Sequence, residues 1–324
     1  MLNRREFSVT LMSSLVMTVG CRSRQKHRPH VIAFANANNA EPYRAAQNDR
    51  MHALVAQRPD FELVVADAQQ DNNKQIAEVE AFIRERPGVL IVAPNERTAL
   101  TDVMGEAMGA GIPVICLERD IVRPNYTTYI RADNEEIGRM AGGFIVKDLT
   151  QRFGTPKGKI VVLRGLLGVE GEIHRDGGSR EVLDRYPDIQ ILADPVANWN
   201  QGEAKDRMTE VLRVQPQIDL VYGHNDPMAV GGYLAAKELG REKEMSFIGV
   251  DGLGGPSGGI KKVMEGILKA TFVYPLCVDK AVEVAVRLLT EPGYKPEKMY
   301  TMQSTLVTQA NARELYEASV VAKS

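Results

Sequence analysis

The sequence has few cysteines and no excess of positive charge. Its three cysteines and five histidines are scattered over 324 residues, at spacings that match no zinc-site pattern. Cys116 lies inside the apolar run 113–117, so we expect a buried thiol there and not a disulfide. The formal net charge is −2, and the only basic block is a short one at 22–28. We therefore expect neither a metal site nor a nucleic-acid partner.

The sequence also lacks the motifs of nucleotide binding and nucleophilic catalysis. Residues 154–159, GTPKGK, miss the spacing of the phosphate-binding pattern G-x-x-x-x-G-K-[ST]. Residues 252–257, GLGGPS, follow an apolar run but put Ser257 at the third glycine position of a dinucleotide-binding fingerprint. No Ser-His-Asp or Cys-His set stands in a motif context. We predict no enzyme activity and no cofactor.

Residues 1–20 have the features of an export signal. Arg4 and Arg5 precede an apolar run at 9–19, which is too short to span a bilayer comfortably, and Cys21 follows a small residue. The beginning resembles the twin-arginine export motif, and residues 18–21 resemble a lipoprotein cleavage box with Thr18 where Leu is usual. We predict an exported protein, periplasmic or anchored outside the cytoplasm by a lipid on Cys21.

The alternatives at the N-terminus are an ordinary amphipathic segment and export by the general secretory route. Residues 21–30 are polar and basic, which is typical of a tether. A repressor would need a helix-turn-helix in this position, and the export signal occupies it.

Short apolar runs alternate with stretches of helical spacing over the rest of the chain. Continuous apolar strands between amphipathic helices indicate parallel sheets covered on both faces. Nine such runs exceed one comfortable sheet, so we predict an α/β fold of two doubly wound parallel-sheet domains. The runs are 31–35, 61–66, 89–93, 113–117, 159–163, 189–193, 219–223, 245–250 and 270–273. We expect the break near 133–134, helices at about 135–150 and at 278–290, and the end of the ordered part at 304–309.

Polar and aromatic side chains follow six of these runs. Ligands of open parallel sheets bind beyond the carboxyl ends of the strands. Amide, carboxylate and guanidinium groups hold neighbouring hydroxyls in pairs, and an aromatic face covers the C–H face of a sugar ring. The pattern favours a site for a sugar or polyol. The candidates are Asn39, Glu41, Tyr43 and Arg44; Glu118 and Arg119; Arg175; Trp199; Asn225; and Asp251.

Each candidate also has a purely structural interpretation. Asn225 and Asp251 are common helix caps at such positions. Glu118 and Arg119 could form a surface ion pair, and a lone tryptophan such as Trp199 is usually a core residue. The coincidence at six strand ends is stronger than any one member.

Over residues 31–308 the chain resembles the bacterial periplasmic sugar-binding family that includes ribose- and galactofuranose-binding proteins. The resemblance rests on VLIVAPNE, GIPVICLERD, TTYIRADN, HRDGGS, VYGHNDPMAVGG, IGVDG and MQSTLV. It implies a type I periplasmic binding protein fold, with two lobes joined by three crossovers. The implied lobes are 31–132 plus 275–303 and 133–274 plus 304–318.

The resemblance also implies binding roles for particular residues. Glu118 stands where the family usually has Asp, and Tyr274 stands where ribose binders have Gln, so the sugar does not carry over. The implied partner is the permease of an ABC-type sugar importer, and the alternative is a membrane sensor. The other implied ligand-binding positions are Tyr43, Arg44, Arg119, Arg175, Trp199, Asn225 and Asp251.

Overall fold

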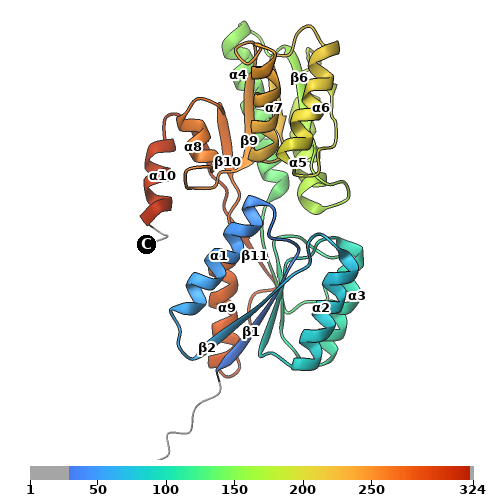
Figure 1. Ribbon diagram of the computed structural model, residues 1–324, viewed down its shortest axis with the longest axis vertical. Helices are drawn as coiled ribbons and strands as arrows, with labels where there is room; N and C mark the ends of the chain where they lie inside the picture. Colours follow the sequence, from blue (N-terminus) through green and yellow to red (C-terminus); the bar gives the residue numbers. More distant parts are fainter. Residues whose placement is uncertain (1–28, 322–324) are drawn as a thin grey trace, which may run out of the picture.

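The structure is a computed structural model that describes residues 29–321 as two α/β lobes, one above the other (Figure 1). The first lobe holds a six-stranded sheet of order β11-β5-β4-β3-β1-β2 in which every neighbouring pair is parallel. Its strands are β1 (His30–Asn36), β2 (Phe61–Asp67), β3 (Val89–Val92), β4 (Val114–Leu117), β5 (Thr128–Ala132) and β11 (Met299–Met302).

Helices cover both faces of this first sheet because its strands are apolar on both sides. Ile32 and Phe34 of β1 pack with α1 (Pro42–Ala56) and α9 (Val278–Thr290). The alternate residues, Ala33 and Ala35, face the layer formed by α2 (Asn72–Glu85) and α3 (Arg97–Gly109). This is the arrangement expected for parallel strands buried on both faces.

The second lobe repeats the plan with the order β12-β10-β9-β8-β6-β7. All its neighbouring pairs are parallel except β10 with β12. Its strands are β6 (Gly158–Leu163), β7 (Ile189–Ala193), β8 (Leu220–Gly223), β9 (Ser246–Asp251), β10 (Ala270–Val273) and β12 (Leu306–Thr308). Its helices are α4 (Asn134–Phe153), α5 (Glu170–Leu183), α6 (Gln201–Val214), α7 (Asp226–Glu238), α8 (Gly259–Met264) and α10 (Ala312–Val321).

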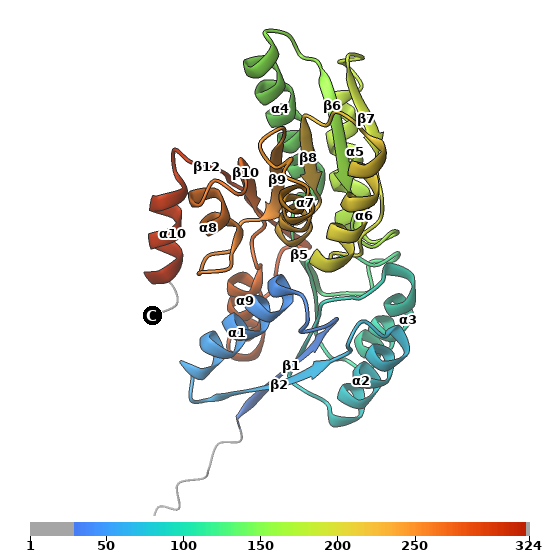
Figure 2. The same cartoon turned by 45° about the horizontal axis from the view of Figure 1, so that its top comes forward.

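The chain passes between the two sheets three times within the described residues. The passages join β5 to α4, β10 to α9 and β11 to β12. Figure 2 shows them running between the lobes. The predicted fold class, two doubly wound parallel-sheet domains of the type I periplasmic binding protein kind, is confirmed. The exact lobe boundaries stay a prediction.

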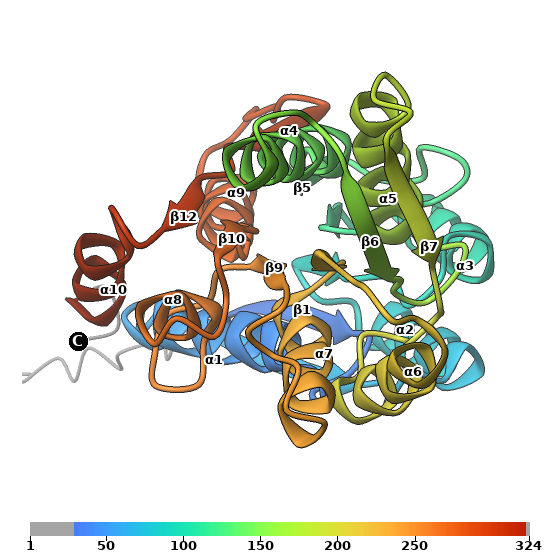
Figure 3. The ribbon, with the colours of Figure 1, turned by 90° about the horizontal axis from the view of Figure 1, so that it is seen from above.

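The expected end of the ordered part at 304–309 is wrong. Residues 306–308 form β12, and the chain continues into α10, which packs beside α8 at one edge of the second lobe (Figure 3). The segment 312–321 is short, and its apolar face is less pronounced than that of α9, so its sequence signal is the weaker of the two. The expected strands and the helix at 278–290 are present.

Helices α4 and α5 lie unusually close together on the second lobe. A Cβ atom at Gly178 would stand 2.2 Å from the backbone oxygen of Glu135, and one at Gly138 would stand 2.6 Å from that of Arg175. Only glycine fits such contacts. The close approach brings the first turns of both helices beside the passages between the lobes.

No helix within residues 29–321 combines the length and apolar character needed to cross a membrane. The predicted export signal at 1–20, Cys21 and most of the predicted tether at 21–30 lie outside the described residues.

Candidate ligand-binding site

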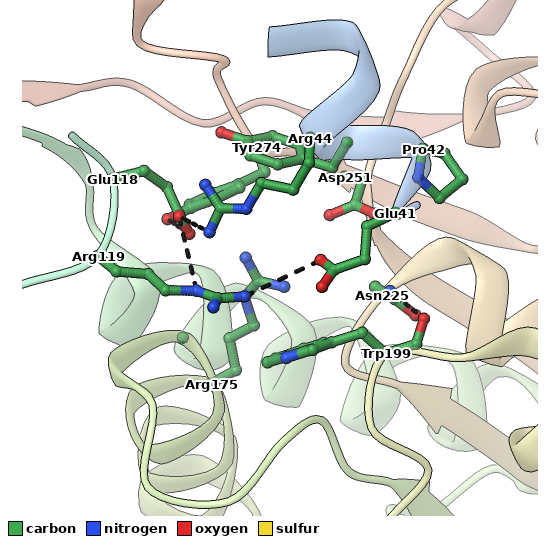
Figure 4. Close-up of a pocket in the computed structure, with 12 residues that line it drawn as sticks. Glu41, Pro42, Arg44, Glu118, Arg119, Arg175, Trp199, Asn225, Asp251 and Tyr274 are labelled. Carbon is green, nitrogen blue, oxygen red and sulfur yellow. Dashed lines mark hydrogen bonds and ion pairs between the residues drawn. The ribbon is translucent and has the colours of Figure 1, made fainter. Parts of the chain in front are cut away.

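A pocket lies between the lobes and is walled by polar and aromatic side chains (Figure 4). Most of these side chains are almost fully buried; Trp199 is the most exposed of the nine buried ones, at 7%. The lining residues are Glu41, Pro42, Tyr43, Arg44, Glu118, Arg119, Gly171, Arg175, Trp199, Asn225, Asp251 and Tyr274. Ten of the eleven predicted site residues therefore converge here. Asn39 is not in the lining; its side-chain oxygen accepts a hydrogen bond from Asn36.

Both lobes contribute to the pocket through the ends of their strands. In the first lobe the start of α1 carries Tyr43 and Arg44, and the segment after β4 carries Glu118 and Arg119. The second lobe contributes from α5, from the starts of α6 and α7 and from the end of β9, while Tyr274 stands on the passage from β10 to α9. A molecule held in this pocket contacts both lobes at once.

Arg44 and Glu118 form a buried ion pair on the wall of the first lobe. Arg44 Nη1 also donates to Gln47 Oε1 at 2.8 Å, and Glu118 Oε1 accepts from the Tyr274 hydroxyl at 2.9 Å. Burial alone would raise the pKa of Glu118, but Arg44 and Arg119 outweigh it and hold that pKa below its usual range. Glu118 is therefore ionised. Its ion pair with Arg44 holds the Arg44 side chain rigidly in the wall of the pocket.

Glu41 is held so that one carboxylate oxygen remains for the pocket. Its Oε1 accepts from Asn38 Nδ2 at 2.9 Å and from Gln70 Nε2 at 3.0 Å. Its Oε2 lies 3.9 Å from Arg119 Nη2, in the middle of the view in Figure 4. Two donors on one oxygen fix the carboxylate and leave the second oxygen as an acceptor.

Arg175 of α5 lies between two aromatic rings at the floor of the pocket. Its Cζ is 4.5 Å from the ring centroid of Tyr274 and 5.6 Å from that of Trp199. Its Nε donates to Asn134 Oδ1 at 2.8 Å, and its Nη1 donates to the backbone oxygen of His224 at 2.5 Å. The remaining nitrogen, Nη2, is the one left for a molecule in the pocket.

Trp199 is presented by a backbone that few residues adopt. Asn198 and Trp199 have φ values of 47° and 64°, in the left-handed region. The six-membered part of the indole packs directly on Gly165, where a Cβ atom would stand 2.2 Å from the ring. The indole Nε1 is buried and has no hydrogen-bond partner among the described residues. It is a donor available to a bound hydroxyl.

Asn225 is both a helix cap and a pocket residue, the two roles considered from the sequence. It is the N-cap of α7, where its Oδ1 accepts from the backbone N–H of Met228 at 2.9 Å. Its Nδ2 donates to the backbone oxygen of Trp199 at 3.1 Å. Asn225 lines the pocket and also holds Trp199 in its place.

Asp251 and Asp226 form a buried acidic pair at the end of β9. Burial, and then the neighbouring Asp226, raises the pKa of Asp251 well above its ordinary value. Burial raises the pKa of Asp226 to about 7, although Asp226 accepts hydrogen bonds from Thr271 and from the backbone of Gly252. Asp251 lines the pocket, so it is the member that a ligand can contact.

Left-handed backbone is concentrated around the pocket. Glu118, Trp199 and Asp251 have φ values of 68°, 64° and 123°, although none is glycine. Gln70, which supports Glu41, has a φ of 64°. Strained backbone of this kind costs about 1–3 kcal/mol per residue and is typical of functional sites.

Sequence reasoning missed Pro42 and Gly171 in the lining, and Asn134 and Glu170 behind it. Asn134 follows the strand-like segment 127–132 and so carried the same signal as the other candidates. We expected only the break between the domains at that position. Gly171 carried no signal, because a glycine in the first turn of a helix has many interpretations. Among the described residues, no three His, Cys, Asp or Glu side chains gather as a metal site.

Two α/β lobes that close on a polar pocket, joined by three passages, define a two-lobed binding protein. The chain belongs to the periplasmic binding protein family, since residues 32–294 match the family model described as periplasmic binding protein domain. This is a family of substrate-binding proteins.

Curated relatives and solved structures agree with this assignment. The xylitol-binding protein of Mycolicibacterium smegmatis is 31% identical over 76% of this chain and 69% of its own. The galactofuranose-binding protein of Escherichia coli is 29% identical over 89% of this chain and 91% of its own. The fructose-binding periplasmic domain of a hybrid two-component system superposes with a TM-score of 0.83 and 35% identity, over 91% of this chain and 95% of that domain.

Proposed function

We propose that the protein binds a neutral monosaccharide or polyol reversibly between its lobes, outside the cytoplasm. One observation carries the proposal: three guanidinium groups, three carboxyl groups and an aromatic face from both lobes line one pocket. Such groups bind hydroxyls in pairs and cover a sugar ring. The xylitol, galactofuranose and fructose named for its relatives support the same class of ligand.

We propose that ten residues contact the ligand directly. Arg119, Arg175 and Trp199 have donors left for it, while Glu41 and Asp251 have acceptors. Arg44 and Glu118 form an ion pair with each other, so they shape the wall of the pocket and have only their remaining polar atoms for the ligand. The others in the set are Tyr43, Asn225 and Tyr274.

A thermal-shift screen tests the proposal. Xylitol, D-fructose, D-ribose and a galactofuranoside are added to the purified protein, and the melting temperature is measured. A ligand at a hundred times its Kd stabilises the folded state by about 2.7 kcal/mol. Mass analysis after long incubation should recover the sugar unchanged, because we propose binding without turnover. If no sugar or polyol raises the melting temperature, the proposed function fails.

The permease of an ABC-type sugar importer is the proposed partner, as for a transport component. A specific observation favours a second candidate, a ligand-presenting protein for a membrane sensor: the fructose-binding domain of a two-component system is 35% identical. Cross-linking in membranes in the presence of the bound sugar, followed by identification of the captured protein, distinguishes a permease from a sensor.

We also propose removal of residues 1–20 and a lipid on Cys21. The motivation is Arg4 and Arg5 ahead of an apolar run that ends at Cys21. Cys21→Ser should move the full-length protein from the membrane fraction to the soluble fraction. Retention of that variant in the membrane would contradict the anchor.

A further inference from the structure

Asn134 stands where the chain passes from β5 into the second lobe, as the first residue of α4. It is fully buried but does not line the pocket. Its Oδ1 accepts from Arg175 Nε at 2.8 Å, and its Nδ2 donates to the Tyr274 hydroxyl at 3.1 Å and to the Glu170 carboxyl group. Both ends of the amide are therefore used, which fixes which way the group points.

These bonds form a continuous chain across the junction of the lobes. The Tyr274 hydroxyl that accepts from Asn134 donates to Glu118 Oε1 at 2.9 Å. Glu118 belongs to the first lobe, Tyr274 to the passage from β10 to α9, and Asn134 to the passage from β5 to α4. The chain ends on Arg175 in the second lobe. It runs through two of the three passages between the lobes.

The pose of Arg175 depends on few contacts. Asn134 holds Nε and the backbone oxygen of His224 holds Nη1, while the rings of Tyr274 and Trp199 lie against the guanidinium group. Without the bond from Nε the guanidinium group can rotate about its side-chain bonds. A ligand would then have to order it on binding, at a cost in affinity.

We propose that Asn134 is a positioning residue for ligand binding. It acts through Arg175, and through Tyr274 and Glu118 it makes the correct pose of Arg175 depend on the closed arrangement of the lobes. This inference rests on the proposed function. The alternative is that Asn134 only stabilises the first turn of α4.

The test uses the full-length protein and a readout that needs no ligand. Trp199 is the only tryptophan and lies against Arg175, so its emission reports the position of that side chain. In ligand-free protein, Asn134→Ala should shift the emission in the same direction as Arg175→Ala, and the double variant should show no further shift. Asn134→Asp keeps an oxygen for Arg175 Nε and should restore the wild-type emission, although it puts a second carboxyl group beside Glu170.

The second readout is the Kd for D-fructose. Asn134→Ala should weaken binding about tenfold or more, the scale of a lost hydrogen bond to a charged group, and should have no effect in the Arg175→Ala background. The control is Asn311→Ala, which removes two side-chain hydrogen bonds in the second lobe, with Thr308 and Leu306, and should leave both readouts unchanged.

Wild-type emission in Asn134→Ala, or a shift in Asn134→Asp as large as in Asn134→Ala, would overturn the inference. Additive effects of Asn134→Ala and Arg175→Ala on the Kd would overturn it as well. If wild-type protein binds none of the sugars screened, the proposed function fails, and the emission of the ligand-free variants still decides the role of Asn134.

Discussion

The position of the Trp199 ring depends on Gly165, which has no side chain to displace it. The ring packs on Gly165 so closely that one added carbon would overlap it, and the left-handed backbone at Asn198 and Trp199 gives the ring little freedom to retreat. Trp199 lines the pocket in this pose. We therefore expect Gly165 to influence binding, although it is not among the lining residues.

Gly165→Ala should displace the ring and weaken sugar binding. The added Cβ would lie 2.2 Å from the ring, and overpacking of this kind costs about 1–3 kcal/mol. We expect a changed Trp199 emission and an affinity about tenfold lower, measured by fluorescence titration. Gly143→Ala, whose Cβ meets open space, is the control. Unchanged emission and affinity in Gly165→Ala would show that the ring is not fixed by this contact.

Glu170 gives the protein a distinct dependence on pH. Burial raises its pKa from 4.5 to about 8, against the opposing effect of Arg131. The folded state therefore retains a proton that the unfolded chain releases above about pH 4.5. The resulting contribution to stability is fully present below that pH and is lost as the pH rises through 8.

Glu170→Gln should remove this contribution to the pH dependence of the free energy of unfolding. The glutamine is neutral at every pH, so the variant should gain stability over the wild type as the pH rises from 5 to 9. Urea unfolding at pH 5, 7 and 9 measures the difference, with the exposed Glu85→Gln as a control for lost charge. An equal difference at all three pH values would contradict the raised pKa.

Helices and strands were predictable from the sequence where one signal dominated. The amphipathic pattern of 278–290 gave the bounds of α9, and the apolar runs gave the strands of both sheets. The pocket residues were largely predictable as well, because ligand groups follow the ends of parallel strands. Asn134 follows a strand in the same way, but its contacts with Arg175 and Tyr274 could not be foreseen from the sequence. Gly165 was not predictable, because its role comes from its distance to Trp199, which no local pattern records.

Adjacent glycines in α5 test how closely it packs on α4. Gly178→Ala should destabilise the protein by about 1–3 kcal/mol, since its Cβ would stand 2.2 Å from the backbone oxygen of Glu135. Gly177→Ala is the matched control: its Cβ meets open space, and alanine is favoured over glycine in a helix by about 1 kcal/mol. Urea unfolding should thus give shifts of opposite sign. Equal shifts would mean that the helices can separate without cost.

We expect the molecule to open before it binds. Most side chains that wall the pocket are almost fully buried, so a sugar should reach them only when the lobes separate. Only three short passages join the two sheets within the described residues, and few bonds have to change for the lobes to separate. Binding is then a shift between open and closed populations.

Locking the lobes together should block sugar entry. Val122 of the first lobe and Leu167 of the second line one groove between the lobes and are 57% and 54% exposed. A Val122→Cys, Leu167→Cys pair joined by a short bifunctional maleimide, in a Cys21→Ser background, should bind sugar far more slowly than either single variant with the same reagent. Cys116 and Cys277 are buried and should not react. Equal rates of binding would mean that the sugar enters without separation of the lobes.

Because the chain passes between the lobes three times, the two ends of its described part lie in different lobes. β1 begins in the first lobe and α10 ends in the second, so the ends belong to bodies that move against each other. A donor dye near residue 30 and an acceptor dye near residue 310 would follow that motion without altering any pocket residue. Energy transfer between them turns the fold into a reporter of the sugar concentration around it.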